Sequence, residues 1–135
     1  LRNPSDMAAV FQRFYGERIA ARFRDLFPQH LTLAAQLVKA AKAGNEREAA
    51  ELEQQWYSNA DAIAAFLNGI NPYWPQAVLR RMLREHLRMT KDEAVFRLQR
   101  DFPSGIAMYD QIERIALEMA DTFADGIVRQ FHLSY

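Results

Sequence analysis

The stretch Phe27-Pro28-Gln29-His30-Leu31-Thr32-Leu33 (FPQHLTL) has a near copy 56 residues later, Leu83-Arg84-Glu85-His86-Leu87-Arg88-Met89 (LREHLRM). A second short match follows each copy, Asn59-Ala60-Asp61 after the first and Met119-Ala120-Asp121 after the second. Repeats of this length usually mark a duplicated helical hairpin whose apolar faces pack together. The sequence therefore predicts an all-α fold built from two related hairpins.

The composition is that of one globular domain. The chain has 135 residues, of which 50% are apolar, with only five glycines and five prolines. This length suffices for a buried core. Seventeen basic and seventeen acidic residues balance, and the densest basic run has acidic neighbours, so no nucleic-acid partner is expected. The absence of cysteine excludes disulfides and thiolate metal sites.

Helix signals divide the chain into five helices. We expect an added N-terminal helix over residues 1–14, a first hairpin over 17–69 and a second hairpin over 75–131. Asn45 with Glu48 predicts a capping box, and Pro28 predicts a kink. Thr90 with Glu93 leaves open a break near Met89. The expected fold is an up-down-up-down four-helix bundle, with the added helix beside it, in a single domain over residues 1–135.

The last helix is apolar on two sides. One stripe comprises Met108, Ile112, Ile115, Met119 and Phe123, and the other Ile106, Leu117, Ala124, Val128 and Phe131. A helix covered on one side needs only one stripe. We therefore expect the second stripe to be covered by the first helix, by N-terminal helices missing from this chain, or by a second copy in a homo-oligomer.

His30 and His86 are the candidate site residues. Both lie within apolar stripes, and their distances from the two hairpin turns place them at similar heights in an aligned bundle. Two imidazoles in one layer could bind a divalent transition metal, with Asn59, Asp61, Glu85 and Asp121 as the other candidate ligands. The alternative hypothesis is structural, with each histidine bonded to a neighbouring polar group. Asp61 and Asp121 are expected to aim away from the histidine layer, which favours the structural hypothesis.

Catalytic motifs are absent from the sequence. It has no glycine-rich phosphate loop, and none of its serines, at positions 5, 58, 104 and 134, lies in a nucleophile context. We therefore expect a non-enzymatic protein that acts through binding or assembly, with a metal-binding bundle as the alternative. No run of about 18 apolar residues predicts a membrane span, and no signal peptide is evident, so a cytoplasmic protein is expected.

Several runs resemble an uncharacterised family of small helical-repeat proteins from Bacillus-like bacteria. They are Leu37–Gly44, Trp56–Asp61, Ile70–Trp74 and Gly126–Val128 with Phe131. The resemblance implies further N-terminal helices, and a chain that starts at Leu1 without methionine is expected of a piece of a longer protein. Asp6 would then correspond to Asp61 and Asp121, since Asp6 precedes His30 by 24 residues and Asp61 precedes His86 by 25.

Two further labels attach to this resemblance. Such proteins are often labelled acetylglutamate kinase, but an amino-acid kinase is similar to an α/β sandwich with glycine-rich loops, which this sequence does not predict. A weaker similarity is to ferritin-like bundles with repeated Glu-His runs, some of which hold metal. Only Glu85-His86 keeps that pair, because Gln29 precedes His30.

Overall fold

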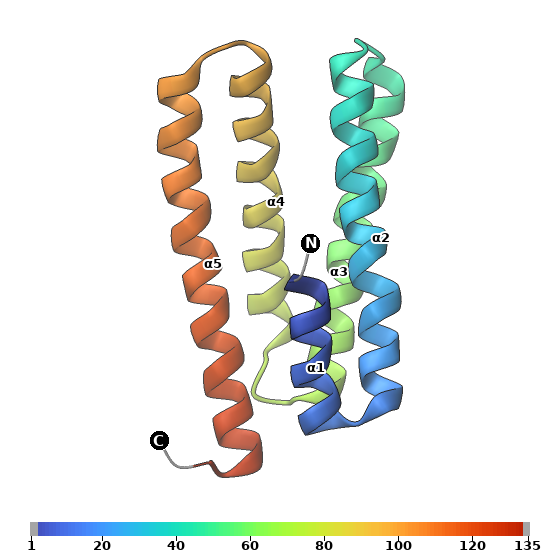
Figure 1. The fold of residues 1–135 in the computed structure, drawn as a ribbon, viewed down its shortest axis with the longest axis vertical. Helices are drawn as coiled ribbons and strands as arrows, with labels where there is room; N and C mark the ends of the chain where they lie inside the picture. The colour runs from blue at the N-terminus through green and yellow to red at the C-terminus, as the bar shows by residue number, and fades with distance from the viewer. Residues whose placement is uncertain (1–2, 134–135) are drawn as a thin grey trace. The chain divides into compact units, whose positions relative to one another are not determined.

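The computed structural model describes residues 3–133, which form five α-helices and contain no strand (Figure 1). The helices are α1 (Asn3–Tyr15), α2 (Glu17–Lys42), α3 (Glu46–Ile70), α4 (Gln76–Leu98) and α5 (Phe102–Phe131). The all-α prediction is confirmed. The chain divides into two compact units, residues 1–63 and 64–135, so the boundary falls inside α3.

Most helix limits agree with the sequence signals. Gly16, at φ 86°, separates α1 from α2. The break near Met89 that the sequence left open does not occur, because α4 continues through this residue. Thr90 does not begin a new helix there: its Oγ1 donates to the carbonyl oxygen of His86 at 2.7 Å, one turn back in the same helix. Pro28 lies inside a continuous α2.

The two hairpin turns have the same backbone hydrogen bonds, 56 residues apart. In the first, Gly44 N–H donates to Ala41 O and Asn45 N–H to Ala40 O, and in the second Arg100 N–H donates to Arg97 O and Asp101 N–H to Phe96 O. These pairs define a Schellman motif, which satisfies the last carbonyls of a helix. The offset equals that between the two histidine stretches.

Each turn also ends in a side-chain cap at the same offset. Asn45 Oδ1 accepts from Glu48 N–H at 3.2 Å, while Glu48 Oε2 accepts from Asn45 Nδ2 at 2.8 Å. The first bond is one that the predicted capping box requires, whereas in the second Glu48 accepts from the Asn45 side chain and not from the Asn45 backbone N–H. In the second turn Asp101 Oδ1 accepts from Ser104 N–H at 3.3 Å. Both caps bind otherwise free N–H groups at a helix start.

Unit 1 contains α1 packed against α2. Phe11 and Phe23 stack with ring centroids 4.6 Å apart, and both are buried. Ala8 and Ala20 are buried with them, and such small side chains let two helices approach closely. The predicted N-terminal helix is therefore an integral part of the first unit's core.

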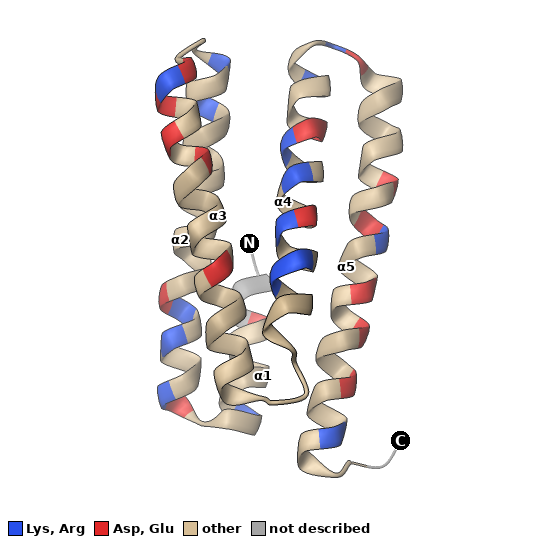
Figure 2. Ribbon diagram, turned by 180° about the vertical axis from the view of Figure 1, so that it is seen from behind, with Lys and Arg blue, Asp and Glu red and all other residues tan. Residues whose placement is uncertain are grey.

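Unit 2 contains the antiparallel hairpin of α4 and α5 (Figure 1). Its core is rich in methionine: Met82 and Met89 of α4 pack with Ile115 of α5, and Met108, Ile112 and Met119 complete the cluster. The predicted first stripe of the last helix is thus the face that packs on α4. Figure 2 shows that charge separates between the two helices, with basic residues concentrated on α4 and acidic residues on α5.

Trp74 lies in the loop before α4, is fully buried and attaches this loop to α5. Its indole Nε1 donates to the carbonyl oxygen of Phe123 at 3.3 Å. Asn68 Nδ2 donates to the Trp74 carbonyl at 2.8 Å, and Trp74 N–H donates to Asn71 O at 3.1 Å. Gly126 lies beneath the indole, where a Cβ atom would sit 2.0 Å from Nε1. The indole can occupy this place only because residue 126 has no side chain.

Within residues 3–133, no helix combines the length and the apolar character that are needed to span a lipid bilayer.

Candidate functional site

A polar cluster lies between α2 and α3 inside unit 1. His30 Nδ1 is 2.7 Å from Asn59 Oδ1, and Asn59 Nδ2 donates to the carbonyl oxygen of Leu26 at 3.3 Å. Asn59 is buried and His30 is half-buried. Two of the residues proposed from the sequence as metal ligands are thus brought together, as a hydrogen-bonded pair.

The bonds of Asn59 determine the tautomer of His30. Because the amide nitrogen of Asn59 donates to Leu26 O, its oxygen faces the imidazole and must accept. His30 Nδ1 therefore carries the proton and donates it. In the neutral ring Nε2 then holds the lone pair, which is the form that accepts a hydrogen bond or binds a metal.

Trp56 forms the apolar wall of this cluster. Its ring stacks on His30 with centroids 5.5 Å apart and an interplanar angle of 27°. The indole is 3% exposed, and its Nε1 has no hydrogen-bond partner among the described residues. A buried donor without an acceptor costs free energy on the order of 1–3 kcal/mol. The cluster therefore holds one unsatisfied donor beside one imidazole lone pair.

Burial changes the titration of His30. Desolvation disfavours the imidazolium and lowers the pKa of His30 below its ordinary value of 6.5, while the hydrogen bond that His30 donates to Asn59 opposes this with a smaller effect. Near neutral pH the ring is consequently uncharged, and the ligand-competent lone pair is present.

The remaining proposed ligands are not part of this hydrogen-bonded pair. His86 is half-buried on α4 in unit 2, and the neighbouring Glu85 faces Arg81, whose Nη1 lies 3.5 Å from Glu85 Oε2. Asp121 is exposed on α5, and Asp61 is half-buried on α3.

The structure does not assemble a metal centre from these residues. Across the described part of the chain, no three His, Cys, Asp or Glu side chains form a group that could hold a metal ion. Glu85 faces an arginine and Asn59 is occupied by His30 and Leu26. The physical reason is that an ion pair and a buried hydrogen bond already satisfy these groups. A metal site therefore stays a prediction.

Most of the second apolar stripe of α5 is exposed, whereas Val128 within it is half-buried. Ile106 is 65% exposed and Leu117 is 61% exposed, and two residues that the sequence stripe did not include, Phe102 and Tyr109, are 59% and 57% exposed. Phe131 continues the stripe at the end of the helix, with 36% exposed. Contiguous exposed apolar surface of this kind marks an interaction site. We call it the α5 outer face.

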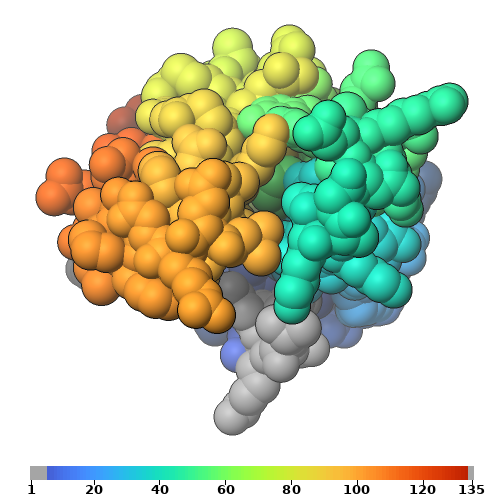
Figure 3. Space-filling model, turned by 90° about the horizontal axis from the view of Figure 1, so that it is seen from above, coloured from blue at the N-terminus to red at the C-terminus, as the bar shows by residue number. Residues whose placement is uncertain are grey.

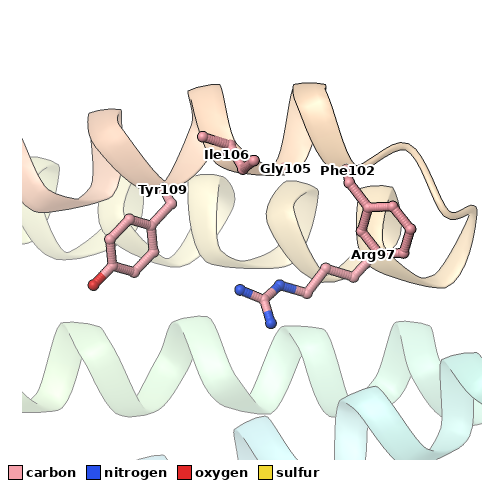
Figure 4. A pocket seen from close by; sticks show the side chains of 5 residues that line it. All are labelled: Arg97, Phe102, Gly105, Ile106 and Tyr109. Atoms are coloured by element: carbon pink, nitrogen blue, oxygen red, sulfur yellow. The ribbon is translucent and has the colours of Figure 1, made fainter.

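A shallow groove lies at the start of the α5 outer face (Figure 4). Phe102, Ile106 and Tyr109 project from α5, and Arg97 reaches in from the end of α4 and forms an ion pair with Glu93. Gly105 is buried between the two helices. The nearby turn, yellow to orange in Figure 3, is part of the outer surface of unit 2.

This groove was not predicted from the sequence, because Phe102 was expected to lie in the turn that precedes the last helix. The available signal was spacing: residues 102, 106, 109, 113, 116 and 120 are separated by four, three, four, three and four positions, which is the period of one helical face. Extending the stripe back from Ile106 by four residues would have included Phe102, and forward by three residues Tyr109.

Comparison with known proteins does not add a function to this geometry. No family model, no curated protein and no solved structure matches the chain. The resemblance to the helical-repeat family stays a prediction.

Proposed function

We propose that this protein is a non-enzymatic assembly module that docks an amphipathic α-helix on the α5 outer face. The observation that carries the proposal is the exposure of four large apolar side chains on one face, Phe102, Ile106, Tyr109 and Leu117, each more than half exposed. Leaving such a face in water is unfavourable, and covering it releases about 25 cal/mol per Å² of buried apolar area.

The shape of the face favours a helix as the occupant. It follows one stripe from Phe102 to Phe131, the whole length of a 30-residue helix. At 1.5 Å per residue the stripe is about 45 Å long. A second helix laid along it can contact every turn, as the helices of a bundle do. A compact loop or a small molecule could occupy only one part of it.

We also propose that α2, α3, α4 and α5 form an up-down-up-down four-helix bundle of duplicated hairpins, with α1 as an added helix. The repeated turns support the duplication. The charges support the packing. Helix α2 has five basic and two acidic residues, and α3 has one basic and five acidic residues. Helix α4 has six basic and three acidic residues, and α5 has two basic and five acidic residues. The net charges are therefore +3, −4, +3 and −3, so helices that follow one another along the chain have charges of opposite sign.

A designed peptide tests the docking proposal. The probe has four heptads with leucine at the first and fourth positions and mixed lysine and glutamate elsewhere, and its control has the same composition in scrambled order. We expect fluorescence anisotropy to show binding of the first peptide only. Leu117→Lys should abolish that binding, whereas Gln111→Lys, at an exposed position outside the stripe, should retain it. Equal binding by both peptides, or none by either, would overturn the proposal.

A metal-binding function is the second candidate, and the lone pair on His30 Nε2 favours it. If a divalent transition metal binds there, it stabilises the native state, because a ligand that binds only the folded chain adds to the free energy of unfolding. Chelator should then lower the melting temperature by several degrees, a divalent ion should restore it, and His30→Ala should remove the effect. A melting temperature insensitive to chelator leaves His30 and His86 as structural residues, which is the outcome we expect.

A further inference from the structure

We propose that the contact between α4 and α5 in unit 2 is a site of reversible methionine oxidation, at which sulfoxide formation on Met108 and Met119 loosens α5 from α4. Four of the five methionines of the chain lie in this contact. They are Met82 and Met89 of α4 and Met108 and Met119 of α5, and we call them the methionine cluster. Helix docking on the α5 outer face is a separate proposal, because the methionine cluster lies on the face of α5 that packs on α4.

The matching positions of the first hairpin contain no methionine. Each residue of the methionine cluster has a counterpart 56 positions earlier, at the same distance from a turn with the same backbone hydrogen bonds. In chain order these counterparts are Leu26, Leu33, Leu52 and Ile63. Leucine, isoleucine and methionine have similar volumes, and exchanges among them usually preserve packing. Filling the core of unit 2 therefore does not by itself require sulfur at four matched positions.

Oxidation of a thioether by a hydroperoxide is a balanced two-electron step. A lone pair on Sδ attacks the terminal peroxide oxygen, and the S–O bond forms as the O–O bond breaks. The departing oxygen takes the proton of the attacked oxygen and leaves as water or as an alcohol. Sulfur loses two electrons and the peroxide gains them. Sulfoxide reductases reverse the change with a dithiol, which becomes a disulfide as water is released.

The chain has no other sulfur chemistry to compete with this step. It contains no cysteine, whose thiolate is the usual target of peroxide in proteins. The fifth methionine, Met7, lies on α1 in unit 1, outside the methionine cluster. Oxidative change is therefore directed to one contact within one unit.

The α4–α5 core accommodates a sulfoxide poorly. The sulfoxide oxygen is polar and needs a donor, but the neighbouring side chains of Ile112 and Ile115 and the other methionines offer none. Thr122 Oγ1 lies 4.0 Å from Met82 Sδ, but its one proton bonds the carbonyl oxygen of Glu118 at 2.9 Å. An oxidised side chain must therefore turn towards water, which separates α5 from α4.

Met108 and Met119 are the expected sites of first oxidation. Both are half-buried and pack at the edge of the α4–α5 core, whereas Met82 and Met89 are only 5% and 4% exposed. A small oxidant reaches the edge of a core before its interior. Loosening of the edge then exposes the two buried sulfurs, so oxidation proceeds inward.

Hydrogen peroxide is the probe, and peptide mass spectrometry of the whole chain locates each added oxygen. We expect sulfoxide at Met108 and Met119 before the two buried members of the methionine cluster. Hydrogen exchange in peptides of α5 should then become at least about tenfold faster relative to peptides of α2, because local opening controls exchange. An unchanged ratio in the oxidised chain would overturn the proposal. Oxidation of Met7 without oxidation of Met108 and Met119 would also overturn it.

The residues of the first hairpin provide the matched control. The double variant Met108→Leu and Met119→Ile should fold with similar stability, because it preserves volume, and peroxide should no longer accelerate exchange in α5. Met7→Leu, on α1, should keep the full response. A double variant that responds to peroxide like the unmodified chain would overturn the assignment to Met108 and Met119.

Reversal distinguishes a switch from oxidative damage. The oxidised chain is treated with a dithiol and the two methionine sulfoxide reductases, one for each sulfoxide epimer. Mass spectrometry should show the loss of both oxygens from Met108 and Met119, and exchange in α5 should return to its original rate. Sulfoxides that the reductases cannot remove, or exchange that stays fast after their removal, would identify irreversible damage and overturn the proposal.

Discussion

The two hairpin turns have one backbone geometry but different residues at its most demanding position. In the first turn Gly44 occupies the left-handed region at φ 74°, and in the second Arg100 occupies it at φ 60°. Glycine adopts this conformation at little cost, whereas a residue with a Cβ atom is strained there. The Schellman hydrogen bonds persist in both turns. The geometry therefore depends on the helix ends and caps that the two turns share, and glycine is not essential for it.

The interiors of the two units differ in a similar way. Each unit buries one tryptophan almost completely, but Trp74 donates its indole N–H to Phe123 O, while the N–H of Trp56 has no partner among the described residues. Trp74 is a fully satisfied structural anchor. Trp56 shares its surroundings with a titratable histidine. The two tryptophans are thus similarly buried but differ in role. Trp74 attaches the loop of unit 2 to α5, whereas Trp56 of unit 1 lies in a polar cluster and has an unsatisfied N–H group.

The largest effect on stability should come from Gly126→Ala, at the residue that lies beneath the indole of Trp74. The new Cβ would lie 2.0 Å from the indole nitrogen, so either the indole or α5 must move. We expect a loss of about 3 kcal/mol or more in the free energy of unfolding, measured by urea denaturation. Gly69→Ala is the matched control, because it lies in the same unit with open space around it; it should be neutral or stabilise by up to about 1 kcal/mol. Similar values for both would mean that the close contact does not exist.

Replacement of each tryptophan by phenylalanine compares the two interiors directly. Both variants lose the same volume, so the difference between them reports the indole N–H. Trp74→Phe removes a satisfied hydrogen bond, whereas Trp56→Phe removes a buried donor without an acceptor. We expect Trp74→Phe to be the more destabilising by about 1–3 kcal/mol in chemical denaturation. An equal loss would show that the Trp56 N–H is satisfied in solution.

Stability should change in opposite directions when the residues with a left-handed backbone conformation in the two turns, Arg100 and Gly44, are replaced. Arg100→Gly should stabilise the chain by about 1 kcal/mol, because it relieves the strain at φ 60°. Gly44→Ala should destabilise it by a similar amount, because it introduces that strain. Thermal melting of both variants measures the pair. A loss of stability in Arg100→Gly would indicate that contacts of the arginine outweigh its backbone strain.

The smallest effect should be the pH dependence contributed by His30. Burial lowers its pKa in the folded chain below the ordinary 6.5, so between these two values the unfolded chain binds more protons. This contribution to stability is complete above pH 6.5 and declines as the pH falls through the lowered pKa. His30→Gln should make the melting temperature less sensitive to pH between 8 and 5. An unchanged slope would assign that sensitivity to other groups.

The sequence by itself determined the local structure. Helix-period stripes and Asn45 with Glu48 as a cap predicted the five helices to within a few residues, because helices and their caps depend on interactions between near neighbours. The repeated histidine stretches likewise indicated the offset at which the two turns match. Where several local signals competed, as at Thr90, the pattern was insufficient, since a side chain that can cap a helix can also bond back within one.

Only the tertiary structure decided which side chains meet. Nothing local to Asn59 indicates that its amide donates to Leu26, 33 residues earlier, and so orients His30. Gly126 looks like any helical glycine until Trp74 is placed on it. The division of α5 into a face that packs on α4 and an exposed outer face required the neighbouring helix, because apolar spacing shows that a stripe exists but not what covers it. Contacts between distant residues depend on packing, and packing is a property of the folded chain as a whole.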